Sequence, residues 1–178
     1  MYATTKLLDA IQKGNVQDVK LLLANSHPLP VTDKECATIL HDAVSANTYL
    51  GNKDAILREV LRQAVNLDML ARNEWGETAL HIATSTPPCV MEFLIQHLLM
   101  TNTEHKLPAY LDCKDSHGDT AFFCACWARN VQVVKLLLRS NASSISKNLR
   151  GDTALHEIAV SMHETDNRLR FSAGDVIF

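Results

Sequence analysis

The chain has 178 residues, of which 47% are hydrophobic and 21% are charged, as in an ordinary globular domain. Its formal net charge of −3 argues against a protein that binds nucleic acid, because a phosphate backbone requires a dense stripe of basic side chains. The sequence has no apolar run of about 18 residues, and its first residues lack the apolar core of a secretion signal, so we expect no membrane insertion.

A short phrase recurs along the chain and sets the order of the predicted elements. Its most eroded copy is 5–10, followed by 36–43, 76–83 and 118–125, and a last copy begins at Gly151. The threonines of the five copies lie at positions 5, 38, 78, 120 and 153, which gives steps of 33, 40, 42 and 33 residues. A repeat of this length predicts a stack of small structural units rather than one folded core.

A second phrase accompanies the first. Residues 15–23 (Asn-Val-Gln-Asp-Val-Lys-Leu-Leu-Leu) and 130–138 (Asn-Val-Gln-Val-Val-Lys-Leu-Leu-Leu) differ at one position in nine, although they lie 115 residues apart. Their apolar residues recur at helical spacing, so each segment is predicted to be a helix that follows the first phrase of its repeat.

These residues carry a family resemblance. A step near 33 residues, the opening Gly-x-Thr-x-Leu-His-x-Ala at 76–83 and a later Val-x-x-Leu-Leu helix resemble the ankyrin repeat. The resemblance implies an all-α solenoid of stacked helix-turn-helix units with short hairpin-like connecting loops. We expect one domain over residues 1–178, with repeats near 4–33, 37–70, 73–112, 115–147 and an incomplete 148–178.

The resemblance also assigns roles within each repeat. The threonine begins the first helix, and the histidine three residues later accepts a hydrogen bond from it. The pairs that match this pattern are Thr38 with His41, Thr78 with His81, and Thr153 with His156. Gly76, Gly118 and Gly151 suit a turn that requires positive φ.

Several positions depart from the pattern. Cys36 stands where the phrase has glycine, which predicts an irregular turn, and Phe123 replaces the usual histidine. Pro87 and Pro88 predict the start of a second helix, since proline is tolerated in a first turn. Asn141 is expected to end a helix in the left-handed conformation. Extra residues at 47–52, and a connection at 101–112 with Pro108, predict two enlarged loops.

The fifth repeat stops near its second helix, on three apolar residues that end at Phe178. A capping repeat has a polar outer face. We therefore hypothesise that the chain is a fragment, and the alternative function is a substrate-recruiting arm of a larger enzyme whose catalytic domain lies beyond Phe178.

Catalytic, cofactor and metal sites are not expected. His41, His81 and His156 belong to the repeat, and the other histidines lack metal-ligand spacing. Cys124 and Cys126 are two residues apart on a predicted helix and point to nearly opposite sides, so they cannot share a metal ion. Five cysteines without a paired framework are typical of a reducing compartment, which predicts an intracellular, cytoplasmic protein.

The expected function is protein binding through the hairpin tips and the exposed face of the first helices, where partners of this family dock. By position, the resemblance marks nine main residues: Glu74, Trp75, Glu77, Ser116, His117, Asp119, Trp127, Leu149 and Arg150. Ser85 and Thr86 are marked on a first helix as well. Trp75 either contacts the partner or folds back onto the 101–112 loop, and Trp127 either contacts the partner or packs between repeats.

The acidic residues of the tips favour a basic or neutral-apolar partner protein over an acidic one. We expect a monomer, since the family is usually monomeric, and a purely structural spacer is a further alternative. The irregular repeat lengths resemble ankyrin proteins of intracellular bacteria and viruses, which implies an effector that engages proteins in the cytosol of a host cell.

Overall fold

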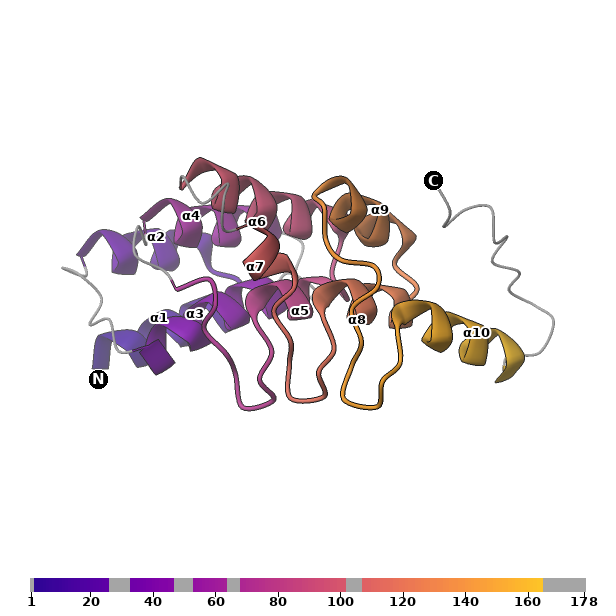
Figure 1. Ribbon diagram of the computed structural model, residues 1–178. Coiled ribbons are helices and arrows are strands. Elements are labelled where there is room, and N and C mark those ends of the chain that lie inside the picture. Colours follow the sequence, from indigo (N-terminus) through magenta and orange to yellow (C-terminus); the bar gives the residue numbers. More distant parts are fainter. Residues whose placement is uncertain (1, 26–32, 47–52, 64–67, 102–106, 165–178) are drawn as a thin grey trace.

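The computed structural model describes residues 2–25, 33–46, 53–63, 68–101 and 107–164, and the regular elements in these ranges are ten α-helices (Figure 1). The only β-pairing there is an isolated antiparallel bridge between Lys114 and Thr120, at the base of a hairpin loop. None of the described helices is long and apolar enough to cross a membrane.

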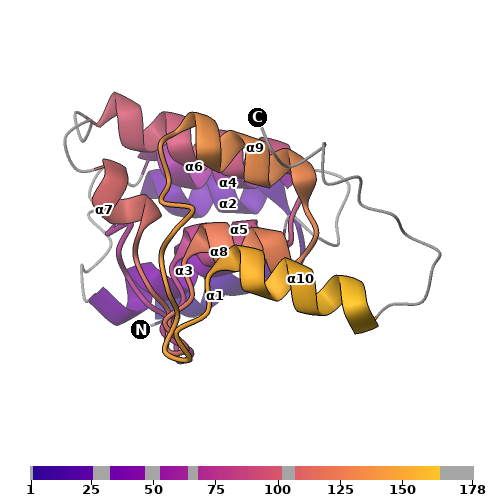
Figure 2. The same cartoon turned by 45° about the vertical axis from the view of Figure 1, so that its right-hand side comes forward.

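The helices form two layers. The first helices of the repeats make one layer, and each contacts the next: α1 (Tyr2–Gln12), α3 (Asp33–Ala46), α5 (Ala79–Ala83), α8 (Ala121–Trp127) and α10 (Ala154–Glu164). The second helices make the other layer: α2 (Val16–Asn25), α4 (Lys53–Gln63), α6 (Pro88–Met100) and α9 (Val131–Arg139). Hairpin loops project below the first layer, as Figures 1 and 2 show. This arrangement confirms the predicted all-α repeat solenoid.

The core lies between consecutive repeats because no single repeat can cover its own apolar face. Leu40 and Leu80 are 1% exposed and Phe122 is 5% exposed, each at the same position of its first helix. Ala83 and Ala125 are fully buried, and their small side chains let neighbouring helices approach closely.

The predicted helix boundaries follow from capping chemistry. Asn15 and Asn130 open the two similar second helices, and each side-chain Oδ1 accepts from the backbone N–H three residues on, at 3.3 Å. Pro88 begins α6 as predicted. Asn141 adopts φ +64° after α9, which confirms the predicted left-handed residue.

Two predicted irregular segments differ from expectation. The 101–112 connection contains a short helix, α7 (Leu107–Leu111), because Leu107 and Leu111 bury their side chains against the stack and Pro108 lies in its first turn. In the second repeat, α3 is helical from Asp33 and so passes through Cys36, where a turn was expected. The other predicted insertion, 47–52, lies outside the described residues.

Candidate functional site

Three hairpin tips share one internal hydrogen-bond pattern, and we define them as residues 73–77, 115–119 and 148–152. In the first tip, Asn73 Oδ1 accepts from the backbone N–H of Trp75 at 3.0 Å and of Glu77 at 2.9 Å. Asp115 and Asn148 make the same pair of bonds in their own tips, at 2.8 to 3.0 Å. The side chain thus takes the place of a backbone acceptor and fixes the turn.

Each tip also requires its glycine. Gly76, Gly118 and Gly151 have φ between +73° and +85°, which confirms the predicted positive values. At two of these positions the next tip approaches closely. A Cβ on Gly76 would lie 2.6 Å from Ser116 Oγ, and one on Gly118 would lie 2.7 Å from the backbone nitrogen of Leu149.

Backbone hydrogen bonds join each tip to the following one. The N–H of Ser116 donates to the carbonyl of Trp75 at 3.1 Å, and the N–H of Leu149 donates to the carbonyl of His117 at 3.0 Å. Ser116 Oγ reinforces the first of these links with a bond of 2.5 Å to the Trp75 carbonyl. The tips therefore hold fixed positions relative to one another.

Basic side chains also link the tips, and we call this series of residues the cation ladder. Arg72 donates to the carbonyl of Lys114, and Lys114 Nζ donates to the carbonyl of Lys147 at 2.7 Å. These three residues occupy the same position, immediately before their tips. Arg72 also donates to the carbonyl of Gly76 at 2.8 Å, so it closes its own tip as well as reaching the next.

Buried imidazoles make a third link. His81 Nδ1 lies 2.8 Å from Thr78 Oγ1, and its Nε2 lies 3.1 Å from the carbonyl of Asp119 in the next repeat. Because a carbonyl can only accept, Nε2 carries the proton and Nδ1 accepts from the threonine hydroxyl. His41 Nε2 bonds the carbonyl of Glu77 in the same way, at 3.1 Å.

The predicted pairing of Thr78 with His81 is thus confirmed, as is that of Thr153 with His156, whose Oγ1 and Nδ1 are 2.7 Å apart. The side chain of Thr38, the third predicted donor, lies outside the described residues. Burial lowers the pKa of His81, although the carbonyl of Asp119 and nearby carboxylates act in the opposite direction. A protonated imidazole would lose its acceptor nitrogen, so the stack requires the neutral form.

The structure exposes most of the predicted binding residues. Trp75 is 60% exposed, Trp127 69% and Leu149 79%, and Glu74, Ser116, His117 and Arg150 are exposed as well. Trp127 therefore does not pack between repeats. Trp75 is not covered by the described part of the 101–112 segment. Thr86, by contrast, is 3% exposed and donates to the carbonyl of Ala83, so its assignment to an exposed helix face was wrong.

Other predicted tip residues have internal roles. Glu77 Oε2 accepts from Asn73 Nδ2 at 2.8 Å, and its carbonyl accepts from His41. Asp119 is half-buried, and burial raises the pKa of its carboxyl group.

The surroundings of the two thiols on α8 disfavour their ionised form. Burial raises the pKa of Cys124 and of Cys126 to about 12, so both are protonated at neutral pH. In the described part of the chain, no three histidine, cysteine or acidic side chains gather as metal ligands would.

A family model described as Ankyrin repeats (3 copies) matches residues 7–148. The chain belongs to the ankyrin repeat family. None of the curated proteins compared with this ankyrin chain matched it. Ankyrin repeats are generally protein–protein interaction modules, and they are typically non-catalytic.

Sequence reasoning missed the cation ladder of this ankyrin chain. Its signal is present, because a basic residue precedes each tip at positions 72, 114 and 147, and an asparagine or aspartate follows it each time. The asparagine or aspartate three residues before a glycine likewise indicates the side-chain bonds inside each tip.

Proposed function

We propose that this ankyrin chain binds a partner protein through its three hairpin tips together with the exposed end of α8. The observation that carries the proposal is the exposure of two tryptophans, Trp75 at 60% and Trp127 at 69%. Tryptophan offers a large apolar surface with one polar N–H, and it is enriched among the residues that dominate binding energy.

The rigidity of the tips supports the same proposal. The backbone bonds from Ser116 to Trp75 and from Leu149 to His117 fix the spacing of neighbouring tips before any partner arrives. Binding to a preorganised surface loses less conformational entropy than binding to loops that must first become ordered. The side chains that differ between tips, such as Trp75 and His117, are then held at defined positions for recognition.

The carboxylates of the tips make contacts within the hairpins, and this changes the kind of partner surface that we expect. Asp115 accepts two backbone N–H groups within its tip, Glu77 accepts from Asn73, and Asp152 lies 3.2 Å from the Arg150 guanidinium. These carboxylates therefore act mainly as hydrogen-bond acceptors and ion-pair partners within the hairpins themselves. We therefore propose a partner surface with an apolar pocket for Trp75, rather than one selected mainly by positive charge.

The test is a binding measurement on a partner recovered by affinity purification and then prepared in pure form. The double variant Trp75→Ala/His117→Ala removes two exposed tip side chains. Both residues bond the next tip through their backbone carbonyls, which the substitutions leave in place. Met100→Ala is the matched control, because Met100 is 81% exposed at the end of α6, in the layer of second helices. Circular dichroism is measured first, to check that all three proteins are equally helical.

We expect the double variant to weaken binding by on the order of a hundredfold and the Met100 control to bind as the wild type does. Equal binding by the double variant would place the interface elsewhere and refute the tip proposal. A chain that captures no saturable partner would support the spacer alternative instead.

We further propose that the chain acts as a monomer in the cytosol of a host cell. Support comes from the irregular steps of 40 and 42 residues between repeats, one of which contains α7, because they resemble host-directed ankyrin proteins. A translocation reporter fused to the chain in its source organism tests the setting. A reporter that never reaches host cytosol would refute it.

A further inference from the structure

Among the described repeats, the last junction lacks two links that the junction before it has. We call the boundary between the repeats of the first and second hairpin tips the inner junction, and that between the repeats of the second and third tips the outer junction. At the inner junction, His81 Nε2 donates to the carbonyl of Asp119 at 3.1 Å. Phe123 has the place of His81 at the outer junction, and a phenyl ring has no N–H to donate. The imidazole link is therefore lost there.

A hydroxyl link is lost in the same way. At the inner junction, both the N–H and the Oγ of Ser116 donate to the carbonyl of Trp75, at 3.1 and 2.5 Å. Leu149 has the place of Ser116 at the outer junction, and its N–H donates to the carbonyl of His117 at 3.0 Å. Because leucine has no hydroxyl group, its side chain adds no second bond.

Other contacts continue across the outer junction. Lys114 Nζ donates to the carbonyl of Lys147 at 2.7 Å as part of the cation ladder, and the side chains of Asp119 and Asn148 share a hydrogen bond. Helix α10 also packs against α8. The outer junction is therefore closed in this structure, but by a smaller variety of links than the inner one.

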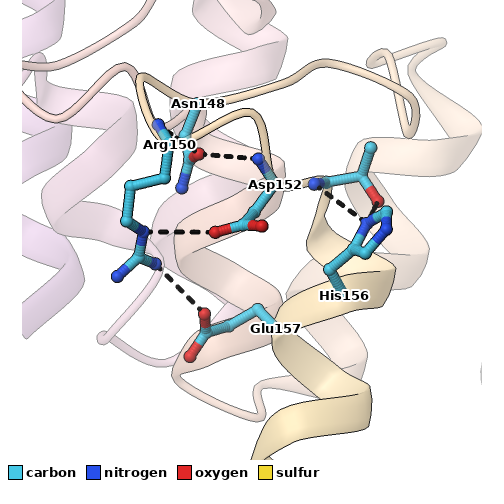
Figure 3. Close-up of polar contacts among 6 residues, drawn as sticks. Asn148, Arg150, Asp152, His156 and Glu157 are labelled. Carbon is cyan, nitrogen blue, oxygen red and sulfur yellow. Dashed lines mark hydrogen bonds and ion pairs between the residues drawn. The ribbon is translucent and has the colours of Figure 1, made fainter.

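The last described repeat is held together by contacts that stay within it. Arg150 lies 3.2 Å from Asp152 Oδ2 and 3.3 Å from Glu157 Oε2, and Figure 3 shows its guanidinium between the two carboxylates. Thr153 Oγ1 and His156 Nδ1 are 2.7 Å apart. None of these bonds crosses the outer junction, so they can persist when it opens.

We propose that the outer junction is a hinge at which the last described repeat, residues 148–164, separates from the stack as one unit. Proteins open in cooperative units, and the unit that breaks the fewest contacts opens most often. Opening the outer junction breaks neither an imidazole bond nor a hydroxyl bond between repeats, whereas opening the inner junction breaks both.

The hinge decides whether the three tips form one surface. In the closed state, the bonds between tips hold all three in line. In the open state, the third tip, with Leu149 and Arg150, leaves the line of the other two. The hinge follows from contacts within the chain, so it does not depend on whether the tips bind a partner.

Amide hydrogen exchange, measured by NMR on the full 178-residue chain, reports the opening. Glu157 and Cys124 have the same position in α10 and α8, and their N–H groups donate to the carbonyls of Thr153 and Thr120 at 3.3 and 2.9 Å. After correction for intrinsic rates, we expect the Glu157 N–H to exchange about tenfold or more faster than that of Cys124. The N–H of Leu149, which crosses the junction, should be as weakly protected as that of Glu157, because the repeat opens as one unit.

Two pairs of variants supply the missing links one at a time. Leu149→Ser adds a hydroxyl, and Leu149→Ala is its matched control. The hydroxyl has the required direction, since a Cβ on Gly76 would lie 2.6 Å from Ser116 Oγ and one on Gly118 would lie 3.0 Å from Leu149 Cγ. Leu149 is 79% exposed, so this pair leaves the core intact. Phe123→His adds the imidazole, and Phe123→Leu is its control without a donor.

We expect Leu149→Ser and Phe123→His each to slow exchange of the Glu157 N–H by about threefold to tenfold relative to the matched control. Slower exchange in Leu149→Ser alone supports the hinge, because Phe123→His also removes apolar bulk from the core. The proposal is overturned if the Glu157 N–H is as protected as that of Cys124 in the wild type. It is also overturned if both added links leave exchange equal to that of their controls, or if Leu149 and Glu157 differ widely in protection.

Discussion

Replacing His81 with phenylalanine tests how much one buried imidazole contributes to the stack. His81 is 3% exposed and bonds the N–H and hydroxyl of Thr78 as well as the carbonyl of Asp119. The chain itself shows what phenylalanine does at this position, since Phe123 occupies it in the next repeat and Thr120 Oγ1 there accepts from the Phe123 N–H. We expect the Thr78 N–H to lose the partner that His81 Nδ1 supplies, at about 1–3 kcal/mol of unfolding free energy.

The same variant changes how stability depends on pH. Because burial lowers the pKa of His81 in the folded state, the unfolded chain binds the proton more readily below pH 6.5. The contribution of His81 is therefore complete above pH 6.5 and is lost as pH falls toward its lower folded pKa, by at most about 1.4 kcal/mol per pH unit. Burial also lowers the pKa of His97, which adds a loss of the same sign.

Urea unfolding followed by circular dichroism at pH 8, 6.5 and 5.5 measures both effects. Burial raises the pKa values of Asp42 and Asp119, which act with the opposite sign, but both groups are present in wild type and variant alike, so the difference between the two proteins reports on His81. We expect His81→Phe to be less stable than wild type at pH 8 and to lose less stability on acidification. A variant with the full wild-type pH dependence would refute the assignment of that dependence to His81.

Three further predictions concern the tips, a cap and a thiol. Gly118→Ala should cost about 3 kcal/mol of unfolding free energy and Gly151→Ala about 1 kcal/mol, because both need positive φ but only the first meets a neighbouring backbone; equal losses in urea unfolding would contradict this. Asn130→Ala should cost about 2 kcal/mol in the same assay, since its side chain caps α9 and donates to two carbonyls of the preceding repeat; a neutral change would show that those bonds do not matter. Cys126, which is 6% exposed and whose pKa burial raises to about 12, should react with Ellman's reagent at pH 8 only after the chain unfolds, and peptide mapping that finds it labelled in the native protein would contradict its burial.

The sequence predicted what depends on a few neighbouring residues. The bond between Thr78 and His81 spans three positions, the left-handed Asn141 follows directly from the end of a helix, and Pro88 starts α6 because proline fits a first turn. Such features are set by local backbone geometry, which a short motif reports well.

Contacts between repeats were harder to foresee. Arg72 reaches Lys114 across 42 residues, and that distance depends on how the whole intervening repeat packs. The short helix α7 was expected to be a loop, because Pro108 and a long connection suggest one and only burial of Leu107 and Leu111 favours the helix. Thr86 was placed on an exposed face by position alone, whereas its hydroxyl is buried against the helix end.

Four side-chain links between consecutive repeats end on backbone carbonyls of the later repeat. Arg72, Lys114, His41 and His81 donate to carbonyl oxygens, and the tips themselves are joined through backbone N–H and carbonyl groups. The side chains at the ends of the tips can therefore diverge during evolution without weakening the scaffold. A substitution of Trp75 or His117 could therefore change the partner while the stability of the fold stays the same. The residues that select a partner and the groups that stabilise the fold can then change independently during evolution.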